Sequence, residues 1–77
     1  MYTVYALKSK IKKYIYVGMT QNLDQRIRRH NNGYEKTTEP YKPFKLIHRE
    51  VYSSRIEAIK RQKYLKSGVG KEFLKTL

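Results

Sequence analysis

The chain has 77 residues, of which 18 are Lys or Arg and only 6 are Asp or Glu, so its formal net charge is +12. A chain of this length buries only about 60% of the surface that it exposes when unfolded, so we expect one domain over residues 1–77 with a small core. The charge argues against an ordinary enzyme for small metabolites and favours a polyanionic partner, with nucleic acid ahead of an anionic membrane surface. A merely solvated basic surface is the plainer alternative.

Cysteine and long apolar segments are both absent. Without cysteine the chain has no disulfide scaffold, no thiol nucleophile and no zinc site built on thiolates. The longest apolar run, residues 14–19, is far too short to cross a bilayer, and the lysines from Lys8 onward leave no room for the apolar part of a signal peptide. We therefore expect an intracellular protein without a membrane partner.

Two β-strands are predicted at the start of the chain. Residues 2–8 alternate in the pattern of a strand, and residues 14–19 are rich in β-forming side chains. The polar residues between them indicate an antiparallel hairpin with a long connection. Because side chains alternate along a strand, Tyr16 and Gly18 lie on the same face of the second strand.

A helix is predicted next. Asn22 is a good N-cap residue, and Leu23, Ile27 and His30 recur at helical spacing. Arg26 and His30 flank this apolar stripe. The Asn-Asn-Gly segment that follows tolerates positive φ and ends the helix.

A loop, a third strand and a second helix are predicted in the second half of the chain. Residues 34–43, which include two prolines, form the loop. Residues 44–52 form a strand in which the even-numbered side chains share one face. Ser54 and Glu57 fit the capping box S-x-x-E and open a helix that runs to about Ser67.

The glycine-containing segment Gly68-Val69-Gly70-Lys71 resembles a phosphate-binding loop only superficially. It lacks the spacer and the terminal Ser or Thr of a P-loop, and it follows a helix rather than a strand. We interpret it as a helix cap and turn, with one last helical turn in residues 71–77. The predicted fold is a small α/β domain, with a three-stranded antiparallel sheet flanked by helices in the order β-β-α-β-α and a short C-terminal helical turn.

Other kinds of catalytic site find little support in the sequence. The single aspartate, Asp24, falls in the first turn of its helix, and no Ser-His-Asp or Cys-His arrangement can be assembled. His30 and His48 would need a third metal ligand, and none suggests itself. A hydrogen-bonded strand residue is the better interpretation of His48.

Four side chains form the informative group, namely Tyr5, Tyr16, Arg26 and His30. The tyrosines come from predicted strands, whereas Arg26 and His30, four residues apart, lie on one face of the next helix. Arg can grip a phosphate with two parallel hydrogen bonds, and Tyr and His can exchange protons beside it. The alternative is that the tyrosines are core aromatics and Arg26 is a solvated cation.

The spacing of these residues resembles that of the GIY-YIG endonuclease family. Thr3-Val4-Tyr5 and Tyr16-Val17-Gly18 stand where the family carries its two name-giving tripeptides. Arg26 and His30 follow in the pattern Arg-x-x-x-His. The first tripeptide departs from the family at its glycine, which is Thr3 here, but it keeps the tyrosine.

The resemblance extends over nearly the whole chain. Residues 54–58 and 64–66 are similar to the second half of the short stand-alone members. The chain is also similar to the nuclease domain of the bacterial nucleotide-excision-repair incision subunit. By this resemblance it hydrolyses DNA phosphodiester bonds with one divalent ion, Mg²⁺ or Mn²⁺, which would polarise the phosphate and the leaving oxygen.

The resemblance also implies roles for the four side chains. Tyr5 and Tyr16 would orient or deprotonate the attacking water. Arg26 would hold the scissile phosphate and stabilise its developing charge. His30 would assist proton transfer or contact the phosphate.

The expected metal ligand is where the sequence departs from the family. The family has a glutamate three residues before an apolar position in the helix after the third strand, and matching that position to Leu65 places the ligand at Gln62. A neutral amide offers one oxygen and no charge, whereas Mg²⁺ sites rely on at least one carboxylate. Glu57 is a weaker alternative, because its capping-box role explains it better. We therefore expect impaired cleavage, either in a member that binds DNA without cutting it or because a glutamate was replaced.

The expected partner is DNA, either duplex or branched. Arg28, Arg29 and Lys66 are predicted to contact it without taking part in the chemistry. The resemblance implies a cytoplasmic, nucleoid-associated bacterial protein of DNA repair. Two other functions stay open: a non-catalytic basic module that binds nucleic acid through phosphate contacts and stacking, and a basic protein that stabilises a ribonucleoprotein.

Overall fold

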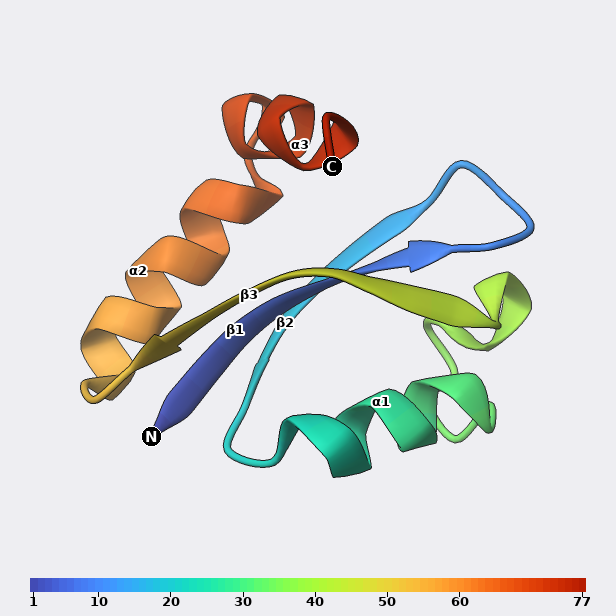
Figure 1. The fold of residues 1–77 in the computed structure, drawn as a ribbon, viewed down its shortest axis with the longest axis horizontal. Coiled ribbons are helices and arrows are strands. Elements are labelled where there is room, and N and C mark those ends of the chain that lie inside the picture. Colours follow the sequence, from blue (N-terminus) through green and yellow to red (C-terminus); the bar gives the residue numbers. More distant parts are fainter.

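The structure, a computed structural model, describes residues 1–77. In chain order its elements are β1 (Tyr2–Ser9), β2 (Ile15–Thr20), α1 (Leu23–Asn31), a short 3₁₀ helix η1 (Glu39–Tyr41), β3 (Phe44–Tyr52), α2 (Arg55–Lys66) and α3 (Gly68–Lys75). The strands form one antiparallel sheet in the order β2-β1-β3, so the predicted fold class is confirmed. Figure 1 shows α1 on one face of this sheet and α2 with α3 on the other. None of the helices has the length and apolar character needed to cross a membrane.

The sheet divides the core into two clusters because side chains alternate along its central strand, β1. Val4 and Ala6 pack against buried side chains of β2, α2 and α3. Tyr5 and Leu7 point to the opposite face, where they pack with Phe44 and with side chains of α1. The alternation predicted for residues 2–8 is therefore confirmed, and it directs Tyr5 toward α1.

A β-bulge in β3 changes the predicted facing of its side chains. Leu7 of β1 pairs with Leu46, but the preceding residue Ala6 pairs with His48. Ile47 is therefore an extra residue in β3, and beyond it the side chains change face. Leu46 lies on the α1 face and His48 on the α2 face, so the prediction that the even-numbered side chains of β3 share one face is wrong.

The first two helices begin where their capping residues predict. The Asn22 side-chain oxygen accepts the backbone N–H of Gln25 at 3.1 Å, and the Ser54 hydroxyl accepts that of Glu57 at 3.4 Å. After α1 the chain turns at Gly33, whose φ of +78° is a conformation that favours glycine. These local signals place α1, with Arg26 and His30, directly after β2.

The third helix begins earlier than predicted. Ser67 caps it, with its hydroxyl accepting the backbone N–H of Gly70 at 3.3 Å, so Gly68-Val69-Gly70 forms the first turn of α3 rather than the predicted helix cap and turn. A Cβ atom at Gly70 would collide with the carbonyl oxygen of Tyr64. Glycine is therefore what lets the eight-residue α3 approach the end of α2 so closely.

Candidate active site

Two tyrosines and a glycine on the α1 face of the sheet form the base of the candidate site. Tyr5 lies on the central strand and is buried, whereas Tyr16 lies on the edge strand β2 and is half-buried. Their ring centroids are 6.1 Å apart. Gly18 pairs with Tyr5 across the strands, and a Cβ atom there would come within 2.6 Å of the Tyr5 hydroxyl oxygen and 2.8 Å of Tyr16 Cε2. Gly18 therefore leaves the space that the two rings occupy.

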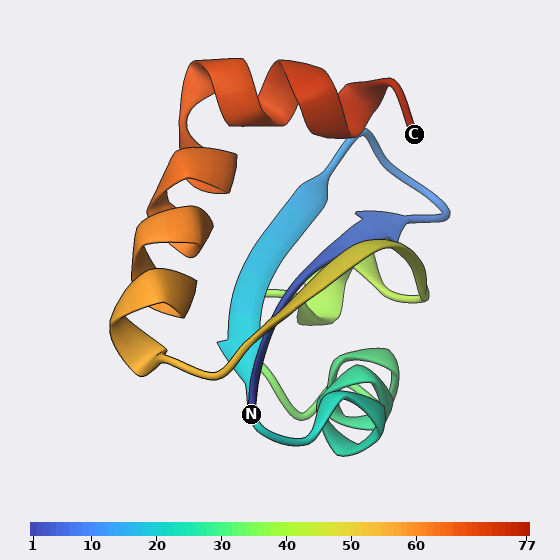
Figure 2. The ribbon, with the colours of Figure 1, turned by 60° about the vertical axis from the view of Figure 1, so that its left-hand side comes forward.

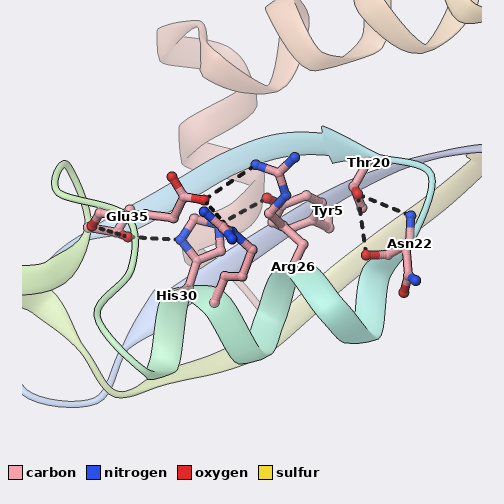
Figure 3. Close-up of polar contacts among 8 residues, drawn as sticks. Tyr5, Thr20, Asn22, Arg26, His30 and Glu35 are labelled. Atoms are coloured by element: carbon pink, nitrogen blue, oxygen red, sulfur yellow. Dashed lines mark hydrogen bonds and ion pairs between the residues drawn. The ribbon is translucent and has the colours of Figure 1, made fainter.

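His30 connects Tyr5 to the loop after α1 (Figure 3). Its Nε2 lies 3.1 Å from the Tyr5 hydroxyl, and its Nδ1 lies 2.8 Å from the Thr38 hydroxyl. The Thr38 hydroxyl donates its proton to the Glu35 carbonyl oxygen, so it accepts the Nδ1–H of His30. Nε2 then accepts the Tyr5 hydroxyl proton, and the ring is neutral. Burial lowers the pKa of His30, which agrees with a neutral ring.

Tyr5 is buried as well, and its burial affects the protonation of its hydroxyl. Tyr5 is 1% exposed. Burial, followed by the effect of neighbouring Tyr16, raises the pKa of the Tyr5 hydroxyl well above its ordinary value. Tyr5 therefore stays protonated and serves as a hydrogen-bond donor to His30.

Arg26 extends from α1 beside this group and faces solvent on one side. Its side chain is 40% exposed, and its Nη1 lies 3.6 Å from Glu35 Oε1, an ion pair too long to be a hydrogen bond. Arg29 makes the closer contact, with its Nε donating to the same oxygen at 2.9 Å. The hydrogen bond from Arg29 lowers the pKa of Glu35, so its carboxylate is ionised near neutral pH. The N–H donors of Arg26 thus stay available, although the Glu35 carboxylate lies close to them.

The structure thus brings together all four side chains singled out in the sequence, and it adds Glu35 and Thr38. Both come from the loop between α1 and β3. No spacing rule connects a loop residue to a helix face, so no pattern in the sequence pointed to them.

The position predicted for the metal ligand lies in another layer of the molecule. Ala58 and Leu65 are the buried side chains of α2. Arg61 lies on one flank of that buried line and reaches Glu50 on β3. Gln62 is 100° further round the helix, so it lies on the other flank, toward the edge strand β2, and it is half-buried.

The remaining predicted residues are distributed around the molecule. Glu57 and Lys66 are exposed at the two ends of α2, and Arg28 is exposed on α1. His48 bonds to Glu50 at 2.6 Å on the α2 face, so the sheet separates it from His30. The two histidines do not form a joint metal site.

The residues present do not fit a divalent ion held by the protein alone. No three His, Cys, Asp or Glu side chains lie together in a group that could hold a metal ion. Glu35 is paired with Arg26 and Arg29, and Gln62 supplies a neutral amide. Because Mg²⁺ sites usually combine one or two carboxylates with substrate phosphates, the group that is lacking is a free carboxylate.

A family model and several similar proteins match most of this chain. A family model described as the GIY-YIG catalytic domain matches residues 1–75. A UPF0213 protein of Clostridium perfringens is 42% identical over 64 residues, which are 82% of this chain and 68% of that protein. A UPF0213 protein of Staphylococcus haemolyticus is 35% identical over 75 residues, which are 96% of this chain and 90% of that protein. The solution NMR structure of a UPF0213 protein from Bacillus halodurans matches with a TM-score of 0.59 and 32% identity, over 99% of this chain and 84% of that one.

Proposed function

The chain belongs to the GIY-YIG family, and from this we propose that residues 1–77 are a DNA endonuclease domain whose cleavage step is impaired by Gln62. GIY-YIG domains are nuclease-type domains that act on nucleic acid, and these nucleases generally depend on a divalent metal ion. The names of the UPF0213 relatives state no activity. The finer proposal therefore rests on the chemistry of the site.

The position of Arg26 carries the proposal. Its guanidinium is partly exposed beside Tyr5 and His30, and no hydrogen bond within the protein uses its donors. Two parallel N–H groups of arginine match two oxygens of a phosphate. In a chain of net charge +12, a guanidinium with unused donors suits the charged phosphate of a phosphodiester better than any small neutral substrate.

The tyrosines and His30 receive different roles in this proposal. Tyr16, half-buried on the edge strand, is the tyrosine that meets the attacking water. Tyr5 is sealed beneath the surface and bonded to His30, so it holds the arrangement together. His30 is 1% exposed and both of its ring nitrogens have partners, so it is a positioning residue that does not touch the phosphate.

Exposed cations bind the rest of the DNA in this proposal. We assign Arg28, Arg29 and Lys66 to phosphate contacts that position the duplex without reading its sequence. A duplex or branched DNA in the bacterial cytoplasm, at the nucleoid, is the proposed substrate.

Gln62 is the proposed reason for weak cleavage. An active form would bind Mg²⁺ or Mn²⁺, and a glutamate at position 62 would supply the missing charge. Without it, the net charge of +12 opposes the binding of a cation. Because Gln and Glu are nearly equal in size and helix propensity, Gln62→Glu leaves the packing of α2 unchanged.

The test measures nicking of supercoiled plasmid with Mg²⁺, with Mn²⁺ and with chelator. Gln62→Glu is expected to produce or greatly raise metal-dependent nicking. Gln25→Glu, which adds the same charge at the exposed start of α1, is expected to produce no metal-dependent nicking. Adding Arg26→Ala to Gln62→Glu should lower the gained rate by about a hundredfold or more, because a positioned charge on the phosphate is lost.

Other results would redirect the assignment. Equal nicking by the Gln62→Glu and unsubstituted proteins would move the ligand to Glu57. No nicking by Gln62→Glu on plasmid or on branched DNA would leave a non-catalytic DNA-binding module, the second candidate. Retained nicking after Arg26→Ala would remove the role that carries the proposal.

A further inference from the structure

A hollow lined by lysines lies at the closed end of the hairpin, beside α3. Its volume is about 570 Å³, and Tyr14 and Ile15 form its less polar part. The rest of its lining is Lys8, Lys13, Lys71 and Lys75. Figure 2 shows α3 passing beside this end of the hairpin. None of these residues belongs to the group around Arg26.

Both sides of this lysine hollow are held in place. The Ser9 hydroxyl accepts the backbone N–H groups of Ile11 and Lys12 at 3.2 and 3.1 Å, and it donates to the Tyr41 carbonyl oxygen at 2.6 Å. These bonds order the connection that carries Lys13. On the other side, Lys71 Nζ donates to the Ile15 carbonyl oxygen at 2.6 Å, which ties α3 to β2.

Three of the four lysines of the lysine hollow, Lys8, Lys13 and Lys71, form no ion pair with an acidic side chain. No acidic side chain is part of the lining. Glu72 pairs with Lys75 at 3.2 Å, but it does so at the surface, where both side chains are exposed. Burial, together with the charges of Lys66 and Lys75, lowers the pKa of Lys71. Like charges are therefore crowded here, and a bound anion would relieve their repulsion.

The form of the lysine hollow suits a polymer of phosphates. Lysine ammonium groups are flexible point charges without the fixed fork of arginine, so they attract phosphate without selecting one small molecule. Ile15 lines the lysine hollow on the α3 face of the sheet, and the next residue of the edge strand β2, Tyr16, points to the α1 face, where the candidate active site lies. The longest dimension of the molecule is 32 Å, close to the length of about ten base pairs. Because β2 is the edge of the sheet, a duplex that lies along this edge can contact both faces.

We propose that the lysine hollow binds the phosphate backbone of the same DNA molecule that presents a phosphate to Arg26. This inference rests on the proposed function. It adds a second contact region, which would hold the duplex along β2 and so fix the direction in which it crosses the site.

The test compares two double variants of equal charge. Lys8→Gln with Lys13→Gln removes two charges from the lysine hollow, and Lys60→Gln with Lys63→Gln removes two from the exposed outer side of α2. Binding to a labelled duplex of about 30 base pairs is measured by fluorescence anisotropy between about 50 and 200 mM salt. Circular dichroism checks that each variant is folded.

The variant of the lysine hollow should bind about tenfold more weakly near 100 mM salt, and its plot of log affinity against log salt should be shallower by about 2. The control pair should change the slope by less than about 0.5, because only the general charge is reduced. Equal effects of the two variants would overturn the lysine hollow as a binding site while leaving DNA binding intact. If the unsubstituted protein showed no salt-dependent binding at all, the proposed function itself would fail.

A second arm replaces DNA by vesicles of phosphatidylcholine with phosphatidylserine, because lipid headgroups also present phosphates. We expect the two double variants to sediment equally with these vesicles. If Lys8→Gln with Lys13→Gln abolished vesicle binding but left DNA affinity at the level of the control pair, the lysine hollow would be a membrane site and the inference would be wrong.

Discussion

In the proposed function, Glu35 lies where a substrate phosphate would approach Arg26. Its Oε1 is 2.9 Å from Arg29 Nε and 3.6 Å from Arg26 Nη1. The hydrogen bond from Arg29 keeps its pKa low, so the carboxylate carries its charge when DNA arrives. We therefore propose that a phosphate at Arg26 displaces Glu35 or meets its repulsion, so that Glu35 competes with the substrate for Arg26.

Glu35→Gln should tighten the binding of duplex DNA by about fivefold at moderate salt, because an exposed ion pair of this kind corresponds to at most about 1 kcal/mol. The matched control is Glu39→Gln in the same loop. Glu39 pairs only with Lys42, at 3.8 Å between exposed side chains, so the control should change affinity by less than about twofold. Fluorescence anisotropy measures both.

Weaker binding by Glu35→Gln would contradict this account. It would mean that Glu35 orients Arg26 for the phosphate, and that losing the orientation outweighs losing the competition. In that case combining Glu35→Gln with Arg26→Ala should give no further loss beyond that of Arg26→Ala alone.

At the scale of the elements, local signals predicted the hairpin and the starts of α1 and α2. Asn22 and Ser54 act on backbone groups three residues away, so their effect can be predicted from a short window of sequence. The bulge at Ile47 and the start of α3 could not be predicted in this way. They depend on pairing with β1 and on the close approach of Gly70 to the end of α2, which are contacts between distant segments.

Local patterns in the sequence likewise predicted some residues of the candidate site and not others. Tyr5, Tyr16, Arg26 and His30 could be predicted because strand alternation and helical spacing place them on facing surfaces. Thr38 and Glu35 could not, because a loop has no period. The burial of His30 could not be predicted either, because it depends on how the loop between α1 and β3 packs against α1.

Glu50 joins β3 to α2 through contacts that no local pattern indicates. Arg61 donates to both of its carboxylate oxygens, at 2.8 and 3.0 Å, and His48 and Tyr52 also bond to it. Burial opposes ionisation of this carboxyl group, but these hydrogen bonds outweigh it and lower the pKa of Glu50 from its ordinary value of 4.5 to about 2. The ionised form therefore stabilises the folded state.

Glu50→Gln should lower the free energy of unfolding near pH 7 by about 2 kcal/mol. Because the folded pKa is the lower one, this stabilisation is present above about pH 4.5 and is lost as the pH falls toward 2. The difference between the two proteins should thus shrink over that interval. Urea unfolding followed by circular dichroism measures it, with Glu57→Gln at the exposed start of α2 as the control.

A difference that stayed constant from neutral to acid pH would contradict the role of the charge. It would assign the loss of stability to altered packing of Arg61 instead. A large effect of Glu57→Gln would contradict the choice of Glu50 as the connection between the two elements.

At the scale of the whole molecule, most of the positive charge has no acidic partner. Four of the six acidic side chains form ion pairs, namely Glu35, Glu39, Glu50 and Glu72. Their basic partners are Arg26, Arg29, Lys42, Arg61 and Lys75, which leaves thirteen of the 18 Lys and Arg side chains unpaired. The unpaired side chains include Arg28 on α1 and Lys8 and Lys13 at the hairpin end. The field that a polyanion meets therefore extends well beyond the candidate site.

This distribution predicts binding that is steep in salt and indifferent to sequence. The affinity for a duplex of about 30 base pairs should fall by about a hundredfold or more between about 50 and 200 mM salt, because each phosphate contact releases condensed counterions. Two duplexes of unrelated sequence should bind within about threefold of each other, since phosphate contacts carry no base information. Anisotropy titrations at a series of salt concentrations measure both quantities. An affinity that stayed constant over this range would show that uncharged contacts hold the DNA, and the charge of +12 would then give no reason to assign a nucleic-acid partner.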